Sequence, residues 1–108
     1  MKRGDIIVAR SKGTLISKAR PNLIVQNDLS LAQSRHICIC PITSEVSGTS
    51  LIRVAVEPTA DNGLRKPSEI ELDLITTVRA SEVAAVIGHV DEETLMKVSR
   101  NLRRWLDL

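Results

Sequence analysis

Three polar residues in this sequence could act together on a phosphate group. Arg20 stands directly before a proline, Thr43 follows an apolar run, and Asp73 belongs to a series of alternating carboxylates. Cleavage of a phosphodiester without a metal needs a base, an acid, and donors for the negatively charged phosphorus oxygens. A guanidinium, a hydroxyl and a carboxylate could divide these tasks. Spacing by itself does not single out these three residues.

Further basic and hydroxyl residues could bind a polyanion around such a centre. They lie where predicted strands end, which is where loops commonly present binding groups: Lys18, Ser44, Arg65, Lys66 and Ser68. The two histidines, His36 and His89, stand far apart at the edges of apolar runs, and structural roles are predicted for both. The sequence contains no GxSxG, P-loop, HExxH or GxGxxG motif.

Composition limits the classes of protein that fit. A chain of 108 residues that is 43% hydrophobic predicts a single domain over residues 1–108, with one modest core. Aromatic residues make up 1%, which argues against binding of single strands by base stacking. The net charge is +2, but basic residues are concentrated in residues 1–66 and acidic ones in residues 67–95. The basic part could face a polyanion.

Neither a metal site nor a membrane segment is expected. Cys38 and Cys40 would share one face of a strand, and buried reduced thiols are predicted because two cysteines supply too few metal ligands. No apolar run is long enough to span a bilayer, and the N-terminal run is too short for a signal peptide. The sequence therefore predicts a cytosolic protein without cofactors.

Short β-rich runs followed by one helix predict an α+β fold. Strands are expected at residues 5–10, 22–26, 36–41, 51–57, 69–74, 75–79 and 86–90, with a loop over 11–19 and turns at 27–28 and 59–63. The third run is apolar on both faces, which predicts a central strand. The run 69–74 alternates Glu69, Glu71 and Asp73 with apolar residues, so neighbouring cations are expected to meet these carboxylates.

The last element is predicted to be an amphipathic helix capped by Asp91. Acidic residues follow the cap and basic residues lie near the C-terminus, as the helix dipole favours. Leu95, Val98, Leu102, Trp105 and Leu106 form one apolar stripe, which is expected to dock on the barrel, although part of it could instead serve a dimer partner.

Five ordered segments closely resemble the MazF/PemK family of toxin endoribonucleases, and in particular its PemK-like subgroup. They are Lys2-Arg3-Gly4-Asp5-Ile6, the run RPNLIVQND over 20–28, Pro41-Ile42-Thr43-Ser44, the turn region 57–68, and Val86-Ile87-Gly88. The chain departs from the family in the short loop 11–19 and in having Glu71 where some members place an arginine.

The resemblance implies an SH3-like small β-barrel with a C-terminal helix, working as a homodimer. It implies sequence-specific, metal-independent cleavage of single-stranded RNA by 2′-hydroxyl transesterification, as in the mRNA interferases of type II toxin–antitoxin systems. Arg20 matches the catalytic arginine of the family, Thr43 its hydroxyl residue, and Asp73 an acidic residue that acts in some members. A guanidinium stays protonated, so Arg20 is expected to stabilise the oxyanion, Thr43 to position the phosphate, and Asp73 to be the candidate base.

The implied partner is an acidic, partly disordered antitoxin of the MazE/PemI type, laid across the basic face. Two alternatives are kept open. One is a CcdB-like inhibitor of DNA gyrase without enzymatic activity, suggested by Trp105 near the chain end. The other is a catalytically degenerate family member.

Overall fold

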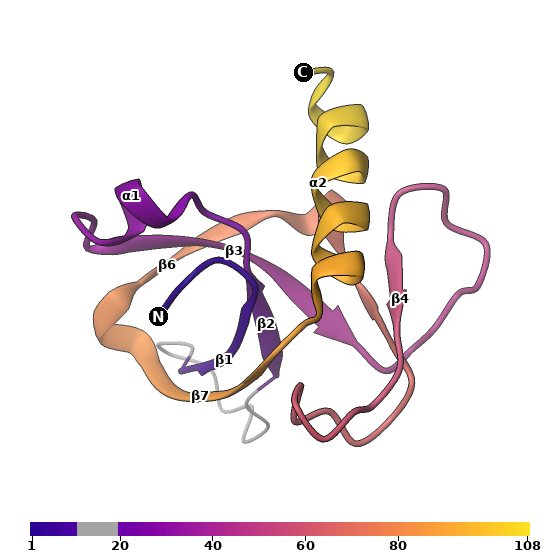
Figure 1. The fold of residues 1–108 in the computed structure, drawn as a ribbon, viewed down its shortest axis with the longest axis horizontal. Coiled ribbons are helices and arrows are strands. Elements are labelled where there is room, and N and C mark those ends of the chain that lie inside the picture. Colours follow the sequence, from indigo (N-terminus) through magenta and orange to yellow (C-terminus); the bar gives the residue numbers. More distant parts are fainter. Residues whose placement is uncertain (11–19) are drawn as a thin grey trace.

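The computed structural model describes residues 1–10 and 20–108, which form seven strands, and Figure 1 shows the long C-terminal helix standing beside the sheet. The elements are β1 (Asp5–Ala9), β2 (Pro21–Ile24), α1 (Asp28–Leu31), β3 (His36–Thr43), β4 (Val54–Val56), β5 (Ser68–Ile70), the 3₁₀ turn η1 (Leu72–Leu74), β6 (Thr76–Arg79), the 3₁₀ turn η2 (Ala80–Glu82), β7 (Val83–His89) and α2 (Glu92–Leu106). No helix in the described ranges is both long and apolar enough to cross a membrane.

All strand pairs are antiparallel, in the order β4-β5-β3-β2-β1-β7, with β6 also paired to β3. The strand β3 is the longest and pairs with β2 on one edge and with β5 and β6 on the other. This confirms the central strand predicted from its two apolar faces. The strands β6 and β7 follow one another around a wide bend, and the sheet is not closed between them.

Alternate residues of the central strands enter two different apolar clusters. The first core contains Cys40 and Ile42 of β3 and is covered by α2. The second core contains Ile37 and Ile39, which point to the opposite face and meet residues of β6 and β7. Cys38 packs against the first core, so both thiols lie on one face as predicted, and burial raises the pKa of Cys40 to about 12.

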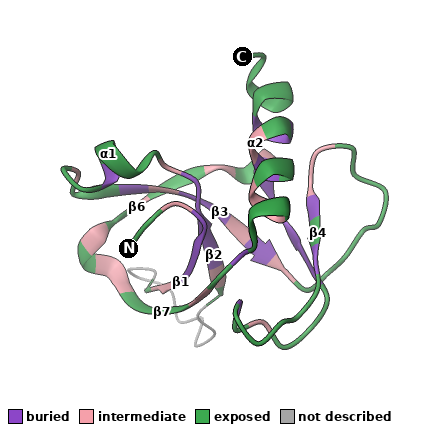
Figure 2. Ribbon diagram, in the orientation of Figure 1, coloured by how far each residue is buried: buried purple, intermediate pink, exposed green. Residues whose placement is uncertain are grey.

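The predicted C-terminal helix is confirmed from its cap to its buried stripe. The carboxylate of Asp91 accepts a hydrogen bond from the Thr94 N–H at 2.8 Å. Val98 and Leu102 are buried against the sheet, whereas Trp105 stays 47% exposed. Figure 2 shows the resulting division of α2 into a buried inner side and an exposed outer side.

Three predicted elements differ from the structure. The run 69–74 is not one strand, because β5 ends at Ile70 and the chain then forms η1. Leu72 enters the first core while Leu74 is 49% exposed, so the strict alternation does not hold. The strand expected at 51–57 shortens to β4, and Asn27 caps the short helix α1 through its contact with the Leu29 N–H instead of closing a turn.

The predicted Asn-Gly turn at 59–63 is confirmed, and it lies closely against β7. The Asn62 side chain accepts from the N–H groups of Thr59 and Leu64 and donates to the Glu57 carbonyl, at 2.8–3.0 Å. Gly63 has a φ of +70°. A Cβ there would stand 2.4 Å from the Ile87 carbonyl oxygen, so glycine is required both by the backbone angle and by the space.

Candidate functional site

The pairing of β2 with β3 brings the predicted arginine and threonine to one end of the sheet. The register pairs Asn22 with Pro41, so Arg20, directly before β2, lies toward the end of β3 that carries Thr43. Continuing this register by two residues beyond the paired ones would set Arg20 opposite Thr43. The Arg20 side chain is exposed, and its carbonyl accepts from the Asn22 side chain at 3.0 Å. A cation and a hydroxyl therefore fall on one strand pair.

Thr43 and Ser44 present hydroxyls at the point where β3 ends. The Thr43 oxygen accepts a hydrogen bond from the Glu45 N–H at 3.1 Å, which fixes the oxygen without using the hydroxyl hydrogen. Thr43 is half-buried and Ser44 is exposed. The hydroxyl of Thr43 thus retains a proton that it can donate to an anion.

The remaining predicted binding residues divide into two groups. Arg65 and Lys66 are exposed on the segment that leads into β5, and β5 pairs with the end of β3 that carries Thr43. Ser68 is buried, and its hydroxyl donates to the Lys66 carbonyl at 2.8 Å, so it is turned toward its own chain. Lys18 lies outside the described residues.

The carboxylates of residues 69–73 converge on Arg53, a residue that the sequence analysis did not single out. Its guanidinium donates to both oxygens of Asp73, with Nε–Oδ1 at 3.0 Å and the second contact at 3.1 Å. The same guanidinium lies 3.4 Å from Glu71 and 4.0 Å from Glu69. The expectation that neighbouring cations meet these carboxylates is confirmed. The sequence does indicate this contact, because Arg53 directly precedes β4 and alternates in phase with Ala55, the outward residue of β4. The strand β4 pairs with β5, which carries Glu69.

This contact changes what Asp73 can do. The hydrogen bond from Arg53 holds the pKa of the Asp73 carboxyl below its ordinary value. A general base works best with a pKa near the operating pH, so an ion-paired aspartate is poorly suited to that task. The geometry instead makes Asp73 the main anchor of the Arg53 side chain.

The carboxylate cluster makes the fold sensitive to acid. Asp73 and Glu69 have pKa values lowered from 3.8 and 4.5, so in the folded protein they remain ionised at a pH where the unfolded chain binds protons. Their stabilising contribution is present above pH 4.5 and is lost as the pH falls through the lowered values. We expect the urea midpoint to drop as the pH is taken from 5 to 2.

Replacing Arg53 by methionine provides the comparison for this prediction. Arg53→Met should lower the urea midpoint at pH 7 and flatten its dependence on pH, because Asp73 loses the donor that depresses its pKa. Arg79→Met, at an exposed position of β6, serves as the matched loss of one charge. An unchanged slope in Arg53→Met would show that the cluster does not control the acid response.

The two histidines, for which structural roles are predicted, are both exposed at the ends of strands. His36 begins β3 and so lies at the opposite end of that strand from Thr43. His89 ends β7 and faces a cavity of about 300 Å³. The two residues therefore form no catalytic pair with each other.

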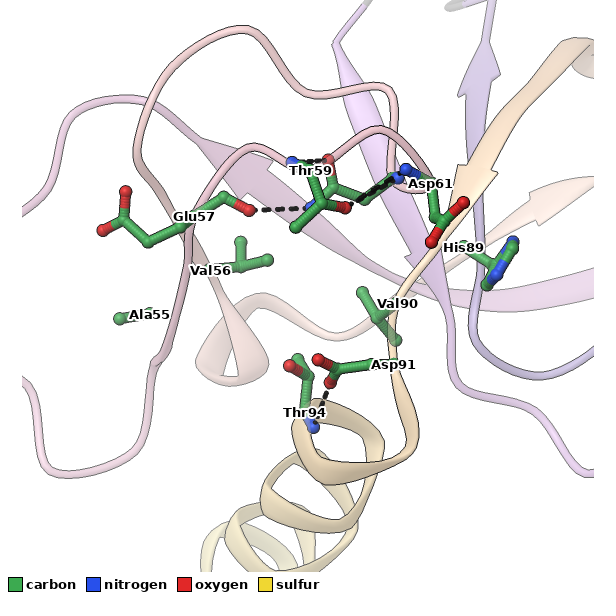
Figure 3. Close-up of a pocket in the computed structure, with 10 residues that line it drawn as sticks. Ala55, Val56, Glu57, Thr59, Asp61, His89, Val90, Asp91 and Thr94 are labelled. Carbon is green, nitrogen blue, oxygen red and sulfur yellow. Dashed lines mark hydrogen bonds between the residues drawn. The ribbon is translucent and has the colours of Figure 1, made fainter.

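The cavity beside His89 is a separate feature from the strand end that carries Thr43. Figure 3 shows it between the 59–63 turn, the end of β7 and the start of α2. Its lining includes the carboxylates of Glu57, Asp61 and Asp91, and none of the predicted site residues. Carboxylates repel a phosphate, so this cavity is a poor match for the chemistry predicted from Arg20.

Taken together, the antiparallel sheet and the C-terminal helix define a small α+β protein, with exposed Arg20 and half-buried Thr43 toward one end of the β2–β3 pair. Comparison with known proteins identifies the family of this protein. Residues 2–106 match the family model described as "PemK-like, MazF-like toxin of type II toxin-antitoxin system". The chain belongs to this family.

Relatives cover almost the whole chain. A probable endoribonuclease MazF of Mycolicibacterium smegmatis is 32% identical over 108 residues, covering 100% of this chain and 98% of the relative. Endoribonuclease EndoA of Bacillus subtilis is 27% identical, covering 95% and 91%. Among solved structures, Mycobacterium tuberculosis toxin MazF-mt6 superposes with a TM-score of 0.80 at 26% identity, covering 96% of this chain and 97% of that one.

These matches confirm the family predicted from the five sequence segments, and they support the toxin hypothesis over the gyrase-inhibitor alternative. The α+β class with a C-terminal helix is likewise confirmed. A mycobacterial endoribonuclease solved in complex with its cognate antitoxin has a TM-score of 0.78 at 24% identity, covering 100% of this chain and 94% of that one. That similarity concerns the fold.

Proposed function

We propose that this toxin is an endoribonuclease that cleaves single-stranded RNA without a metal. The RNA 2′-hydroxyl attacks the adjacent phosphorus, the 5′-oxygen leaves with a proton, and a cyclic phosphate remains on the upstream fragment. The observation that supports the proposal is the position of Arg20 directly before β2, toward the end of β3 that carries Thr43, in a chain of this family.

Arg20 and Thr43 have complementary roles in this reaction. The guanidinium of Arg20 supplies fixed donors to the phosphorus oxygens, whose negative charge grows in the transition state. The Thr43 hydroxyl donates to the same phosphate and fixes its position. Asp73, which the resemblance implied as the base, supports Arg53 instead, because its carboxylate is already held by that guanidinium.

The proposed RNA path continues from this pair over neighbouring exposed residues. Ser44 follows Thr43, and Arg65 with Lys66 precedes β5, which pairs with the same end of β3. Cations bind the phosphates and carry no sequence information, whereas hydroxyls can contact base edges. Ser68, being buried, is not part of this path, and we keep Lys18 as a proposed RNA contact on the sequence resemblance alone.

The remaining expectations of the family are part of the same proposal. The strands that enclose the second core form an SH3-like barrel in one domain, two chains associate as a homodimer in the cytosol, and an acidic antitoxin covers the RNA face. The family description itself names a toxin–antitoxin system. Electrostatic attraction between an acidic antitoxin and Arg65 or Lys66 should weaken as salt is raised.

The deciding experiment is incubation of the purified protein with long single-stranded RNA in excess EDTA. Discrete fragments ending in cyclic phosphate are expected, and mapping their ends on a transcript pool gives the sequence that is cut. Intact RNA across transcripts of varied sequence would contradict the proposal. Loss of gyrase supercoiling activity without RNA cleavage would instead select the gyrase alternative, and a folded protein that is harmless on expression would select the degenerate one.

A further inference from the structure

Glu69 is a buried carboxylate that contacts the loop following Thr43. Its side chain is 6% exposed. Oε1 accepts from the Ser47 N–H at 3.1 Å and from the Ser47 hydroxyl at 3.2 Å, and Oε2 accepts from the Gly48 N–H at 3.1 Å. Such a set of donors is what an ionised carboxylate needs when water is removed from it.

The loop donors, more than Arg53, hold this carboxylate. Arg53 approaches Glu69 only to 4.0 Å, whereas it makes its close bidentate contact with Asp73. The hydrogen bonds from Gly48 and Ser47 are also the leading causes that lower the pKa of Glu69. Glu69 therefore mainly binds the loop, whereas Asp73 and Glu71 bind Arg53, although all three carboxylates lie near that guanidinium.

Residues 44–48 form a loop, here called the Thr43 loop. Both of its ends are held beside the cross-strand pair of Thr43 and Glu69. Thr43 pairs directly with Glu69 across β3 and β5. At the start of the loop, the Glu45 N–H donates to the Thr43 hydroxyl oxygen. At its end, the Gly48 N–H donates to the Glu69 carboxylate. Gly48 adopts a φ of +71° with open space around it, so packing does not hold this end of the loop.

The side chains that the loop offers to solvent depend on this attachment. Ser44, Glu45 and Val46 are all exposed. If the N–H groups of Ser47 and Gly48 lost their acceptor, the chain from Ser44 onward would have one fixed end in place of two. The position of the hydroxyls next to the strand end would then be free to vary.

We propose that Glu69 is a positioning residue for RNA cleavage, which holds the Thr43 loop so that the Thr43 and Ser44 hydroxyls face the scissile phosphate. This inference rests on the proposed function. Glu69 does not touch the RNA, since its oxygens are occupied by loop donors behind the exposed surface. Burying its charge under these donors also reduces its repulsion of the RNA backbone.

The test compares Glu69→Gln with Glu71→Gln. Glutamine has the same shape as glutamate and keeps one acceptor oxygen. Its NH₂ group replaces the other oxygen and faces a loop N–H, so one hydrogen bond between residue 69 and the loop is lost. Glu71 contacts the same Arg53 at 3.4 Å, and within the described part of the chain its carboxylate makes no hydrogen bond to the Thr43 loop, which makes Glu71→Gln the matched loss of one carboxylate. Single-turnover cleavage should show kcat reduced about tenfold in Glu69→Gln with KM changed less than about threefold, since a small misplacement of a reacting group is costly.

A second measurement separates positioning from general loss of stability. Amide hydrogen exchange at Ser47 and Gly48 should become faster in Glu69→Gln and stay unchanged in Glu71→Gln, with both proteins folded by circular dichroism. The cleavage-site distribution should broaden only in Glu69→Gln. Equal kcat and KM in Glu69→Gln and the wild type, with the wild type active, would overturn this inference alone, whereas an inactive wild type would overturn the proposed function with it.

Discussion

Replacing Arg20 by alanine is expected to lower kcat for RNA cleavage by roughly 10²–10³-fold, the usual loss when one oxyanion donor is removed. The Arg20 side chain is exposed, and among residues 1–10 and 20–108 its hydrogen bond is the one that its backbone carbonyl accepts from the Asn22 side chain. The free energy of unfolding should therefore stay within about 0.5 kcal/mol of the wild-type value. Single-turnover cleavage of a labelled oligonucleotide and urea unfolding measure the two quantities.

Two variants control this prediction. Arg20→Lys retains the charge but not the planar array of donors, so it should recover only part of the lost rate. Arg35→Ala removes another exposed arginine that directly precedes a strand, at the far end of β3, where its carbonyl also accepts a hydrogen bond. If Arg35→Ala slowed cleavage as much as Arg20→Ala, the effect would come from overall positive charge and not from the strand end.

Replacing Gly63 by alanine is expected to destabilise the fold by about 3 kcal/mol, the combined cost of a left-handed backbone angle and a steric overlap. At Gly63 the φ is +70°, and a Cβ would lie 2.4 Å from the Ile87 carbonyl oxygen and 3.1 Å from its carbonyl carbon. These are backbone atoms of β7 and cannot move aside like the end of a side chain. Urea unfolding followed by circular dichroism measures the loss.

Gly48 offers a closely matched comparison for this substitution. Its φ is +71°, but no atom lies within 4 Å of the position a Cβ would take. Gly48→Ala should therefore cost only the backbone term, about 1 kcal/mol. The difference between the two variants isolates the contact between the 59–63 turn and β7. Equal losses would mean that the turn can shift away from β7 without cost.

Local elements of the fold could be predicted because their signals lie within a few residues. Asp91 and the N–H of Thr94 are three positions apart, and the apolar stripe that buries Val98 starts at Leu95, four positions after Asp91. The Asn62-Gly63 pair fixes its turn in the same way, through bonds to residues on either side. The apolar character of both faces of β3 was enough to predict its central position.

The run 69–74 shows where sequence patterns stop being informative. Alternation of charged and apolar residues predicts a strand with carboxylates toward solvent. In the structure, Leu72 is drawn into the first core and the carboxylates turn inward to Arg53, so the chain leaves the strand conformation. The burial of Leu72 and the contacts of Glu71 and Asp73 with Arg53 outweigh the local preference. No pattern within the run indicates this partner.

The candidate site was identified by residue type and family resemblance, and its arrangement came from the strand pairing. Arg20 and Thr43 could be named from the sequence, as could Asp73. Their relation depends on the β2–β3 register, which brings Arg20 toward the end of β3 that carries Thr43, and on Arg53, whose guanidinium binds the Asp73 carboxylate.

The sequence by itself determined the helix α2, the glycine turn, the central strand and membership of the toxin family. These depend on backbone propensities, on hydrogen bonds within about four residues, and on ordered motifs. Only the tertiary structure decided that Glu69 holds the Thr43 loop and that Arg53 gathers the three carboxylates. Those contacts join residues about twenty positions apart, and their energies depend on burial and on register, which arise only when the sheet has formed.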